Sequence, residues 1–172
     1  MENYIPDIYQ KSIYSIDYDM LAKRGIKCIL FDLDNTLVPP SSKLPNKKLQ
    51  DLIDSIKTKM TPIIFSNSSE KRIKPFVEQL KIEGYTNVDK KFEEQINEII
   101  SKNNLGINEI AIVGDQVLTE ISLGNLVGIT TILVNPISKY ESFKIKLNRA
   151  KEKKILKKLR DRDLFLVGRY YE

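Results

Sequence analysis

Carboxylate, hydroxyl and amide side chains follow three runs of apolar residues in this 172-residue sequence. They are Asp32 and Asp34 after residues 26–31, Ser66 and Asn67 after residues 62–65, and Asp115 after residues 110–113. Two carboxylates at positions i and i+2 of a strand exit can face the same space. Such carboxylates suffice to hold Mg²⁺, which prefers hard oxygen ligands, and a carboxylate can also attack phosphorus. The pattern therefore favours phosphoryl transfer.

The composition restricts the chemistry further. The chain has no histidine and one cysteine. Triads and dyads that use an imidazole base are therefore excluded, as are histidine-bearing zinc sites. A single cysteine also excludes an internal disulfide and a CxxC site. Catalysis must then depend on carboxylates, hydroxyls, amines and hard cations.

The other polar residues near these positions suit a phosphate substrate. A carboxylate two residues after the nucleophile can protonate the leaving oxygen and then activate water. A serine hydroxyl beside the N–H groups of a helix N-terminus suits phosphate oxygens, and Lys90 or Lys91 can offset their charge. Each segment alone is also explained as a turn, a helix cap or a solvated surface. The prediction depends on all of them occurring together.

The apolar pattern places these residues in an α/β fold. Short, nearly continuous apolar runs alternate with segments in which apolar residues recur at helical spacing. This alternation predicts a Rossmann-like, three-layer α/β/α fold with a mostly parallel sheet. The predicted strands are 26–32, 61–66, a short one near 85–88, 109–114 and 129–134, and the predicted helices are 46–58, 70–81, 92–103 and 117–127. Right-handed crossovers would bring the carboxyl ends of the strands to one edge, where open α/β sheets bind ligands.

Glycines and the two flanks complete the predicted organisation. Gly84, Gly106 and Gly128 each follow a helical pattern, so we expect each to end a helix in the left-handed conformation. Residues 1–20 hold enough apolar side chains to pack on the body, and residues 139–162 predict an appended helix. Since no low-complexity linker divides the chain, we expect one domain.

The segment FDLDNTLV at residues 31–38 resembles the DxDxT signature of the haloacid dehalogenase (HAD) phosphatase superfamily. The later motifs of that superfamily are matched in order by Ser66, Lys91 and the segment 114–120. The strings FSNSSE at 65–70 and VGDQ at 113–116 are further similar to the YqeG-type, subclass III A branch, which is related to phosphatidylglycerophosphate phosphatases. The resemblance covers roughly residues 5–160 and implies a HAD fold over the single expected domain, 1–172.

This resemblance implies a role for each matched residue. Asp32 would be the nucleophile and a Mg²⁺ ligand, and Asp34 would be the general acid and base and lend its backbone carbonyl to the metal. Ser66 and Asn67 would bind the phosphoryl group, whose charge Lys91 would stabilise. Asp115 would be a further Mg²⁺ ligand. The implied activity is that of a Mg²⁺-dependent phosphomonoesterase with an aspartyl-phosphate intermediate.

Two positions depart from the pattern of this branch. Lysine in the branch is usually followed by Pro, whereas Lys91 is followed by Phe92, so Lys90 stays an alternative. Glu120 stands where Asp is usual, and its extra methylene leaves open whether its carboxylate reaches the metal. Neither departure removes the nucleophile or the acid and base, so activity is expected.

The spacing of the motifs leaves no room for a large cap domain. The 34 residues from Asp32 to Ser66 are used by a loop, a helix and a strand, and the 25 from Ser66 to Lys91 by a helix and a short strand. In the HAD superfamily, substrate choice often depends on such a cap. An open site implies a large substrate that itself excludes water, or poor selectivity on small ones. A phosphorylated lipid headgroup, such as that of phosphatidylglycerophosphate, fits the first case.

The positive charge of the chain is concentrated near its C-terminal end. Residues 139–162 contain eleven basic and three acidic residues, a net +8, which leaves −3 of the total +5 for the rest of the chain. Such a basic arm suits an anionic membrane surface, where each Lys or Arg contributes about 1 kcal/mol. A solvated helix face explains it equally well. Nucleic acid is disfavoured as a partner, because no aromatic stripe accompanies the basic residues.

Two alternative functions are a non-catalytic signalling module of the receiver type and a basic nucleic-acid-binding adaptor. A receiver normally carries an isolated Asp after its third strand, whereas Asp89 is followed by two lysines and does not follow an apolar run. An adaptor would bind nucleic acid in a salt-sensitive manner without Mg²⁺. The catalytic reading accounts for more of the motifs.

The N-terminal segment has neither the basic nor the apolar region of a signal peptide. No apolar run approaches the roughly 18 residues of a membrane span. We therefore expect a cytoplasmic protein, peripheral to the membrane if the basic arm contacts lipid.

Overall fold

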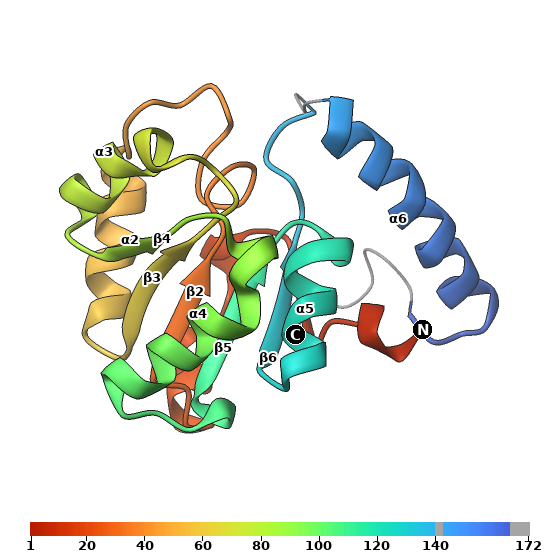
Figure 1. Ribbon diagram of the computed structural model, residues 1–172, viewed down its shortest axis with the longest axis horizontal. Helices are drawn as coiled ribbons and strands as arrows, with labels where there is room; N and C mark the ends of the chain where they lie inside the picture. Colours follow the sequence, from red (N-terminus) through yellow and green to blue (C-terminus); the bar gives the residue numbers. More distant parts are fainter. Residues whose placement is uncertain (140–142, 166–172) are drawn as a thin grey trace.

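A parallel β-sheet forms the centre of the computed structural model, which describes residues 1–139 and 143–165. Its strand order is β1-β6-β5-β2-β3-β4, and each neighbouring pair is parallel. The strands are β1 (Ile8–Gln10), β2 (Cys28–Phe31), β3 (Thr61–Phe65), β4 (Glu83–Tyr85), β5 (Ile110–Gly114) and β6 (Thr130–Val134). Helices cover both faces (Figure 1), so the predicted Rossmann-like α/β/α fold is confirmed.

The helices divide between the two faces of the sheet. They are α1 (Tyr18–Lys23), α2 (Lys47–Lys57), α3 (Glu70–Leu80), α4 (Val88–Asn103), α5 (Ser122–Val127) and α6 (Phe143–Asp161). Apolar residues of α1, α2 and α3 pack together on one face, and those of α4 and α5 pack on the other. Short 3-10 helices cover Glu2–Tyr4, Ile13–Ser15 and Ile107–Glu109, and a π-helical turn, η4, covers Val117–Ile121.

Strand β2 supplies apolar side chains to both layers because successive residues of a strand point to opposite faces. Ile29 and Phe31 pack with α2 and α3, whereas Cys28 and Leu30 pack with α4 and α5. These four side chains are completely buried. The nearly continuous apolar run that predicted this strand is therefore the result of burial on both faces.

Helix α6 lies beside the sheet and the helices rather than within the two main layers (Figure 1). Its Leu159 is fully buried and packs with Tyr9 of β1, Ile121 of η4 and Phe165. The predicted C-terminal helix is therefore present over most of the basic segment. Among the described residues, no helix is both long and apolar enough to cross a membrane.

The structure corrects three element boundaries. The strand predicted near 85–88 ends at Tyr85, and Val88 already begins α4. The helix predicted from residue 92 therefore starts earlier, and Lys91 interrupts it with φ −128° and ψ 22°. The helix predicted over 117–127 is divided into the π-helical turn and α5. Tertiary packing of the buried Val88 explains the early start, since it anchors the first turn of α4.

The prediction for the glycines was correct only for Gly128, which ends α5 with φ 86°. The left-handed residues after α3 and α4 are instead Lys81 and Asn104, with φ 54° and 52°. Gly84 lies within β4, where a Cβ would come 2.7 Å from a side-chain carbon of α3. Its small size serves close helix–sheet packing, not helix termination.

The N-terminal flank contributes an edge strand that the sequence did not reveal. Residues Ile8 and Tyr9 of β1 pair with Ile132 and Leu133 of β6. The prediction was only that residues 1–20 pack on the body. Since a three-residue strand is too short to show a periodicity, its pairing depends on the neighbouring β6.

Candidate active site

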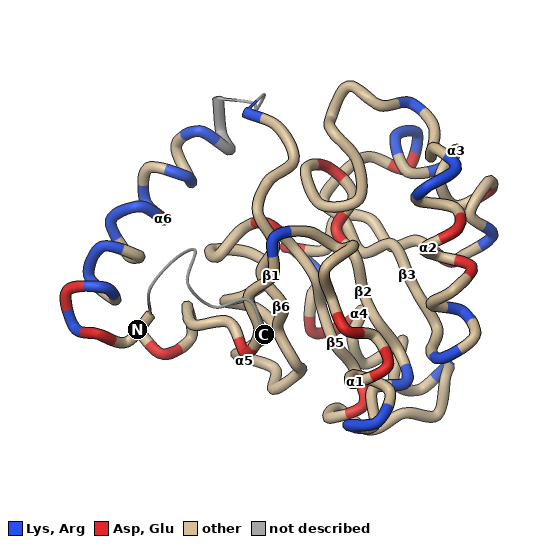
Figure 2. Tube along the Cα trace, turned by 180° about the vertical axis from the view of Figure 1, so that it is seen from behind, with Lys and Arg blue, Asp and Glu red and all other residues tan. Residues whose placement is uncertain are grey.

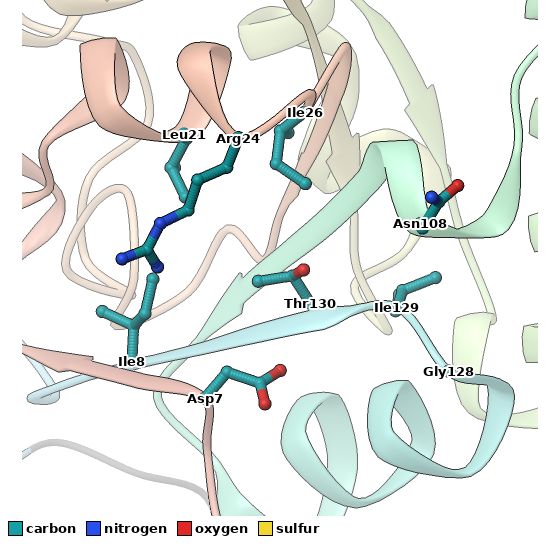
Figure 3. Close-up of a pocket in the computed structure, with 9 residues that line it drawn as sticks. All are labelled: Asp7, Ile8, Leu21, Arg24, Ile26, Asn108, Gly128, Ile129 and Thr130. Atoms are coloured by element: carbon teal, nitrogen blue, oxygen red, sulfur yellow. The ribbon is translucent and has the colours of Figure 1, made fainter.

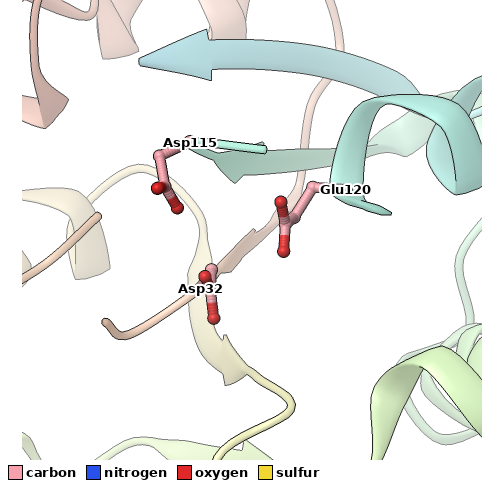
Figure 4. A group of neighbouring side chains, drawn as sticks. All are labelled: Asp32, Asp115 and Glu120. Carbon is pink, nitrogen blue, oxygen red and sulfur yellow. The ribbon is translucent and has the colours of Figure 1, made fainter. Parts of the chain in front are cut away.

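Three carboxylates meet at the carboxyl ends of the central strands. Asp32 directly follows β2, Asp115 directly follows β5, and Glu120 projects from η4. Oxygens of the three carboxylates lie within 4.8 Å of one another, and all three residues are buried (Figure 4). The two central strands are direct neighbours in the sheet, which explains how residues distant in sequence form this acidic cluster.

Glu120 reaches the cluster because its side chain lies directly over Gly114. A Cβ at Gly114 would come 2.3 Å from Cγ of Glu120, so a larger residue at this position would displace the carboxylate. Oε2 of Glu120 accepts hydrogen bonds from the Thr119 hydroxyl at 2.7 Å and the Gln116 N–H at 3.3 Å. Glu120 is therefore part of the acidic cluster.

Asp32 is fixed by backbone and side-chain hydrogen bonds. Its N–H donates to the Val113 carbonyl at 3.0 Å, which continues the β2–β5 pairing by one residue. Oδ1 accepts from the Leu33 N–H at 2.8 Å, and the Ser66 hydroxyl also hydrogen-bonds this carboxylate. Asp32 is 6% exposed. Its carboxylate is therefore held at the edge of the sheet with little rotational freedom.

Burial raises the pKa values of all three carboxyl groups, and the charges of neighbouring carboxylates add to the rise for Asp32 and Glu120. Burial raises the pKa of Asp32 to about 8, the charges of Asp115 and Asp34 add to this, and the hydrogen bonds from Ser66 and Leu33 oppose it. Burial likewise raises the pKa of Glu120 well above its ordinary value, with further contributions from Asp32 and Asp115. Such a cluster of desolvated carboxyls favours binding of a cation.

Asp115 has a different set of partners. Burial raises its pKa, and the neighbouring Arg149 guanidinium opposes that rise. The Thr36 hydroxyl donates to Oδ1 of Asp115 at 3.1 Å, and Oδ2 forms an ion pair with Arg149 of α6. Thr36 is the last residue of the DxDxT segment, so this segment brings a hydroxyl from the loop after β2 to the residue after β5.

The structure does not bring the carboxylate of Asp34 into the acidic cluster. Oδ2 of Asp34 accepts from the Ser68 hydroxyl at 2.8 Å. Oδ1 accepts from Nη2 and Nε of Arg72 at 2.8 and 3.2 Å. The side chain of Asp34 is 30% exposed. The environment of Asp34 therefore differs from that of the buried Asp32.

Of the residues predicted to bind phosphate, Ser66 lies next to the cluster and the others lie further out. Ser66 is buried, and its Oγ accepts from the Ser68 N–H at 3.1 Å. Asn67 is exposed, and its Oδ1 accepts from the N–H of Asp89 at 2.9 Å. This bond ties the start of α4 to the loop after β3. Lys90 and Lys91, which follow directly, are both exposed.

Two arginines in the site were not found by sequence reasoning. Arg72 lies in the first turn of α3, three residues after its N-cap Ser69, and a basic residue there contradicts the usual preference for acidic side chains. This unexpected basic residue in the first turn could have identified Arg72 from the sequence. Arg149 is one of eleven basic residues in its segment, and no sequence feature distinguishes it from the rest.

A cavity of about 320 Å³ lies at the opposite edge of the sheet (Figure 3). It is lined by residues at the amino ends of β1 and β6, including Asp7 and Thr130, together with Arg24 and Asn108. The Asp7 carboxylate accepts from the Thr131 N–H at 2.8 Å, so it serves the pairing of these strands. The acidic cluster at the carboxyl edge is the better candidate for catalysis.

The fold is shared with solved structures of proteins described as HAD-type hydrolases. A Legionella pneumophila protein described as a HAD superfamily (subfamily III A) hydrolase has the same fold, with a TM-score of 0.53 and 18% sequence identity. The similarity covers 73% of this chain and 74% of that one. A predicted HAD-like hydrolase from Porphyromonas gingivalis, with a TM-score of 0.51 and 12% identity, covers 73% and 98% respectively.

The chain belongs to the mitochondrial PGP phosphatase family, whose model matches residues 1–138. It is 32% identical over 158 residues to "Probable phosphatase YqeG" of Bacillus subtilis (strain 168), covering 91% of this chain and 92% of that protein. It is 27% identical over 176 residues to phosphatidylglycerophosphate phosphatase 1, chloroplastic/mitochondrial, of Arabidopsis thaliana, covering 96% of this chain and 48% of that protein. The resemblance inferred from the motifs is confirmed, and the chain is a phosphatase.

Proposed function

We propose that this phosphatase hydrolyses a phosphomonoester through an aspartyl-phosphate on Asp32, with Mg²⁺ as cofactor. The observation that carries the proposal is the convergence of three buried carboxylates, with Asp32 at the end of the central strand β2. Membership of a phosphatase family supports the reaction class. The residue roles are those that the resemblance implies, and the contacts of each side chain are given in their support.

The acidic cluster fits a Mg²⁺ ion by the chemistry and spacing of its donors. Mg²⁺ binds hard oxygens at about 2.0–2.1 Å, which separates ligand oxygens by up to about 4 Å. The carboxylate oxygens of Asp32, Asp115 and Glu120 lie within 4.8 Å of one another, so small side-chain rotations are sufficient. The backbone carbonyl of Asp34 is a further proposed ligand. When bound, the ion would stabilise the ionised carboxylates and offset charge on the phosphoryl oxygens.

In the first step, a carboxylate oxygen of Asp32 attacks phosphorus and the bond from phosphorus to the ester oxygen breaks. The hydrogen bonds from Ser66 and Leu33 orient this carboxylate. Asp34, in its protonated form, donates a proton to the leaving oxygen, which departs as an alcohol. Its outer position and partial exposure support this role, because a leaving alcohol needs a path to solvent.

In the second step, the Asp34 carboxylate removes a proton from a water molecule as that water attacks the aspartyl-phosphate. The bond from phosphorus to the Asp32 oxygen breaks, so phosphate leaves and the Asp32 carboxylate is restored. Asp34 ends the cycle protonated, as it began. The contacts from Ser68 and Arg72 support this assignment, because they hold the Asp34 carboxylate in one orientation for both proton transfers.

The phosphoryl group would be bound by Ser66 and by the segments around it. Ser66 directly contacts Asp32, so its hydroxyl can hydrogen-bond an oxygen of a phosphoryl group at Asp32. Asn67 fixes the start of α4 through the Asp89 N–H, and this tether sets the position of Lys90 and Lys91. Lys91, where the helix is kinked with φ −128° and ψ 22°, is the proposed charge-stabilising residue.

A phospholipid headgroup is the proposed substrate class. The described segments between β2 and β3 and between β3 and β4 contain α2 and α3 but no additional domain over the site, so an extended lipid substrate can approach. The lysines of α6 from Lys146 to Lys158 are exposed and densely placed (Figure 2), which supports peripheral contact with an anionic surface. The name of the Arabidopsis relative points to the same substrate.

Phosphate release from phosphatidylglycerophosphate in vesicles, compared with p-nitrophenyl phosphate in solution, tests this proposal. We expect Mg²⁺-dependent release from both, with the vesicle substrate preferred, and no release above background for Asp32→Asn. The control Asp54→Asn removes an exposed carboxylate on α2 and should keep full activity. Mg²⁺-dependent hydrolysis that survives Asp32→Asn would contradict the mechanism. Rapid turnover of soluble esters with none on vesicles would contradict the lipid substrate.

A further inference from the structure

Helix α6 contacts the acidic cluster through the side chain of Arg149. Its Nη2 forms an ion pair with Oδ2 of Asp115, and its Nη1 donates to the backbone carbonyl of the same residue at 2.6 Å. Nη1 also donates to Oε2 of Glu152, one turn further along α6, at 3.0 Å. Arg149 thus holds both the backbone and the carboxylate of a proposed metal ligand.

Glu152 completes the attachment on the other side. This glutamate is 4% exposed, although it lies in a strongly basic helix. Its Oε1 accepts from the Leu118 N–H at 3.1 Å, in the turn that leads from Asp115 to Glu120. Together, Arg149 and Glu152 attach α6 to the segment that supplies two of the three clustered carboxylates.

The remaining basic residues of this part of α6 behave differently. They are exposed, namely Lys146, Lys151, Lys153, Lys154, Lys157, Lys158 and Arg160. The side chain of Arg149 is only 18% exposed. Apolar contacts from Leu159 and Ile155 fix the other end of the helix. The position of Arg149 is therefore a specific feature of the docked helix, not a consequence of its general positive charge.

A guanidinium and a divalent cation would compete for the Asp115 carboxylate. Oδ1 of Asp115 already accepts from Thr36, and Oδ2 is taken by Arg149. Two positive charges that share one buried carboxylate repel each other strongly where solvent screening is weak. Full binding of a cation at Asp115 therefore requires Arg149 to loosen its contact.

We propose that Arg149 of α6 is a built-in counter-ion that competes with the divalent cation for Asp115, so that docking of α6 and cation binding oppose each other. The proposal rests on the cation site proposed above. By thermodynamic reciprocity, the cation weakens the docking of α6 by the same factor by which docked α6 weakens the cation. An anionic surface that attracts the exposed lysines of α6 would then favour the cation-bound site.

Isothermal titration calorimetry with Mg²⁺, in the absence of substrate, tests whether Arg149 and the cation compete for Asp115. Arg149→Met keeps much of the length of the side chain but removes its charge. We expect it to bind Mg²⁺ more tightly than the wild type by about 5- to 150-fold, the usual range of coupling between sites. The control Lys151→Met removes an exposed charge two residues away and should change the affinity less than about twofold. Equal or weaker binding by Arg149→Met would overturn the proposal.

Amide hydrogen exchange of α6 in the wild type provides a second test that needs no variant. Saturating Mg²⁺ should accelerate exchange across residues 146–161 and leave β2 and β5 unchanged. In Arg149→Met, exchange of the same residues should not depend on Mg²⁺. Unchanged or slower exchange of α6 in the wild type would overturn the inference while leaving the cation site intact. A wild type that binds no Mg²⁺ would overturn the proposed function and this inference with it.

Discussion

Arg72 lies alongside Asp34, with Nη2 and Nε at 2.8 and 3.2 Å from the same carboxylate oxygen. The other oxygen accepts from Ser68, and Nη1 of Arg72 donates to the Ser42 carbonyl. The arginine therefore connects the proposed acid and base to α3 and to the loop before α2. In this arrangement, Asp34 is oriented by groups outside the acidic cluster.

Replacement of Arg72 by methionine should lower turnover about tenfold or more, because an acid and base contributes about 10²–10⁴-fold and part of that depends on orientation. Steady-state and pre-steady-state phosphate release would measure the effect. An alkyl phosphate should be affected more than p-nitrophenyl phosphate, since its leaving oxygen needs a proton. Lys71→Met, which removes an exposed neighbouring charge, should have wild-type activity. Unchanged turnover in Arg72→Met would exclude a positioning role.

The contact of Gly114 with Glu120 predicts a second variant. In Gly114→Ala, the new methyl group overlaps the Glu120 side chain, so we expect a loss of stability of about 1–3 kcal/mol and weaker Mg²⁺ binding. Thermal unfolding and calorimetry would measure both. Gly106→Ala is the matched control, because φ there is −92° and the Cβ would approach the ends of two side chains, Asn108 at 2.9 Å and Glu109 at 3.9 Å, and no backbone atom within 4 Å. If Gly114→Ala bound Mg²⁺ as tightly as the wild type, Glu120 would not be a ligand.

The buried carboxylates should destabilise the metal-free protein at neutral and alkaline pH. Burial raises the pKa of Asp32 from 3.8 to about 8. A group with a raised folded pKa contributes stability at acid pH, and this contribution is lost as the pH rises from about 4 to about 8. Asp32→Asn should therefore raise the stability of the metal-free protein near pH 8 by about 0.5–2 kcal/mol.

Thermal unfolding in a chelator at about pH 5 and about pH 8 would test this effect. The stabilisation by Asp32→Asn should be larger at the higher pH, because more of the wild-type carboxyl groups are then ionised. The variant Asp54→Asn, which changes an exposed carboxylate, should show no pH-dependent gain in stability. If Asp32→Asn were no more stable than the wild type at the higher pH, the buried Asp32 carboxylate would not destabilise the metal-free protein.

The exposed lysines of α6 predict the membrane behaviour. Replacing Lys153, Lys154, Lys157 and Lys158 by glutamine should weaken binding to anionic vesicles by about 10²–10³-fold, at about 1 kcal/mol for each charge. Hydrolysis of p-nitrophenyl phosphate should not change. A control variant with Lys47, Lys48, Lys71 and Lys74 replaced by glutamine has the same net charge. It should lose far less of its affinity for anionic vesicles. Vesicle co-sedimentation would measure both, and equal losses would show that α6 is not the contact.

Most of the sheet followed from the sequence because its central strands are buried on both faces. Runs such as residues 28–31 are apolar at every position, and that pattern is readable without tertiary information. Strand β1 was missed because its three residues depend on β6 for pairing. The start of α4 was misjudged because Lys91 interrupts the helical geometry there, while Val88 anchors the preceding turn.

Two acidic residues of the cluster, Asp32 and Asp115, were predictable from strand ends, but their partners were not. Asp32 and Asp115 directly follow adjacent parallel strands, and topology alone brings such residues together. The contact between Arg149 and Asp115 joins residues 34 positions apart. It depends on how α6 docks, which is set by a few apolar contacts such as that of Leu159. Charge pattern alone could suggest only a basic surface.

Trapping of the covalent intermediate tests the central claim most directly. In Asp34→Asn, p-nitrophenyl phosphate can still phosphorylate the enzyme, because its leaving group needs no proton, whereas hydrolysis of the intermediate lacks its base. Acid quenching followed by peptide mass spectrometry should find one phosphoryl group on the peptide that contains Asp32, and none in the double variant Asp32→Asn/Asp34→Asn. A phosphoryl group on another residue, or turnover by the wild type without any phosphorylated Asp32 in the trapped variant, would contradict the account.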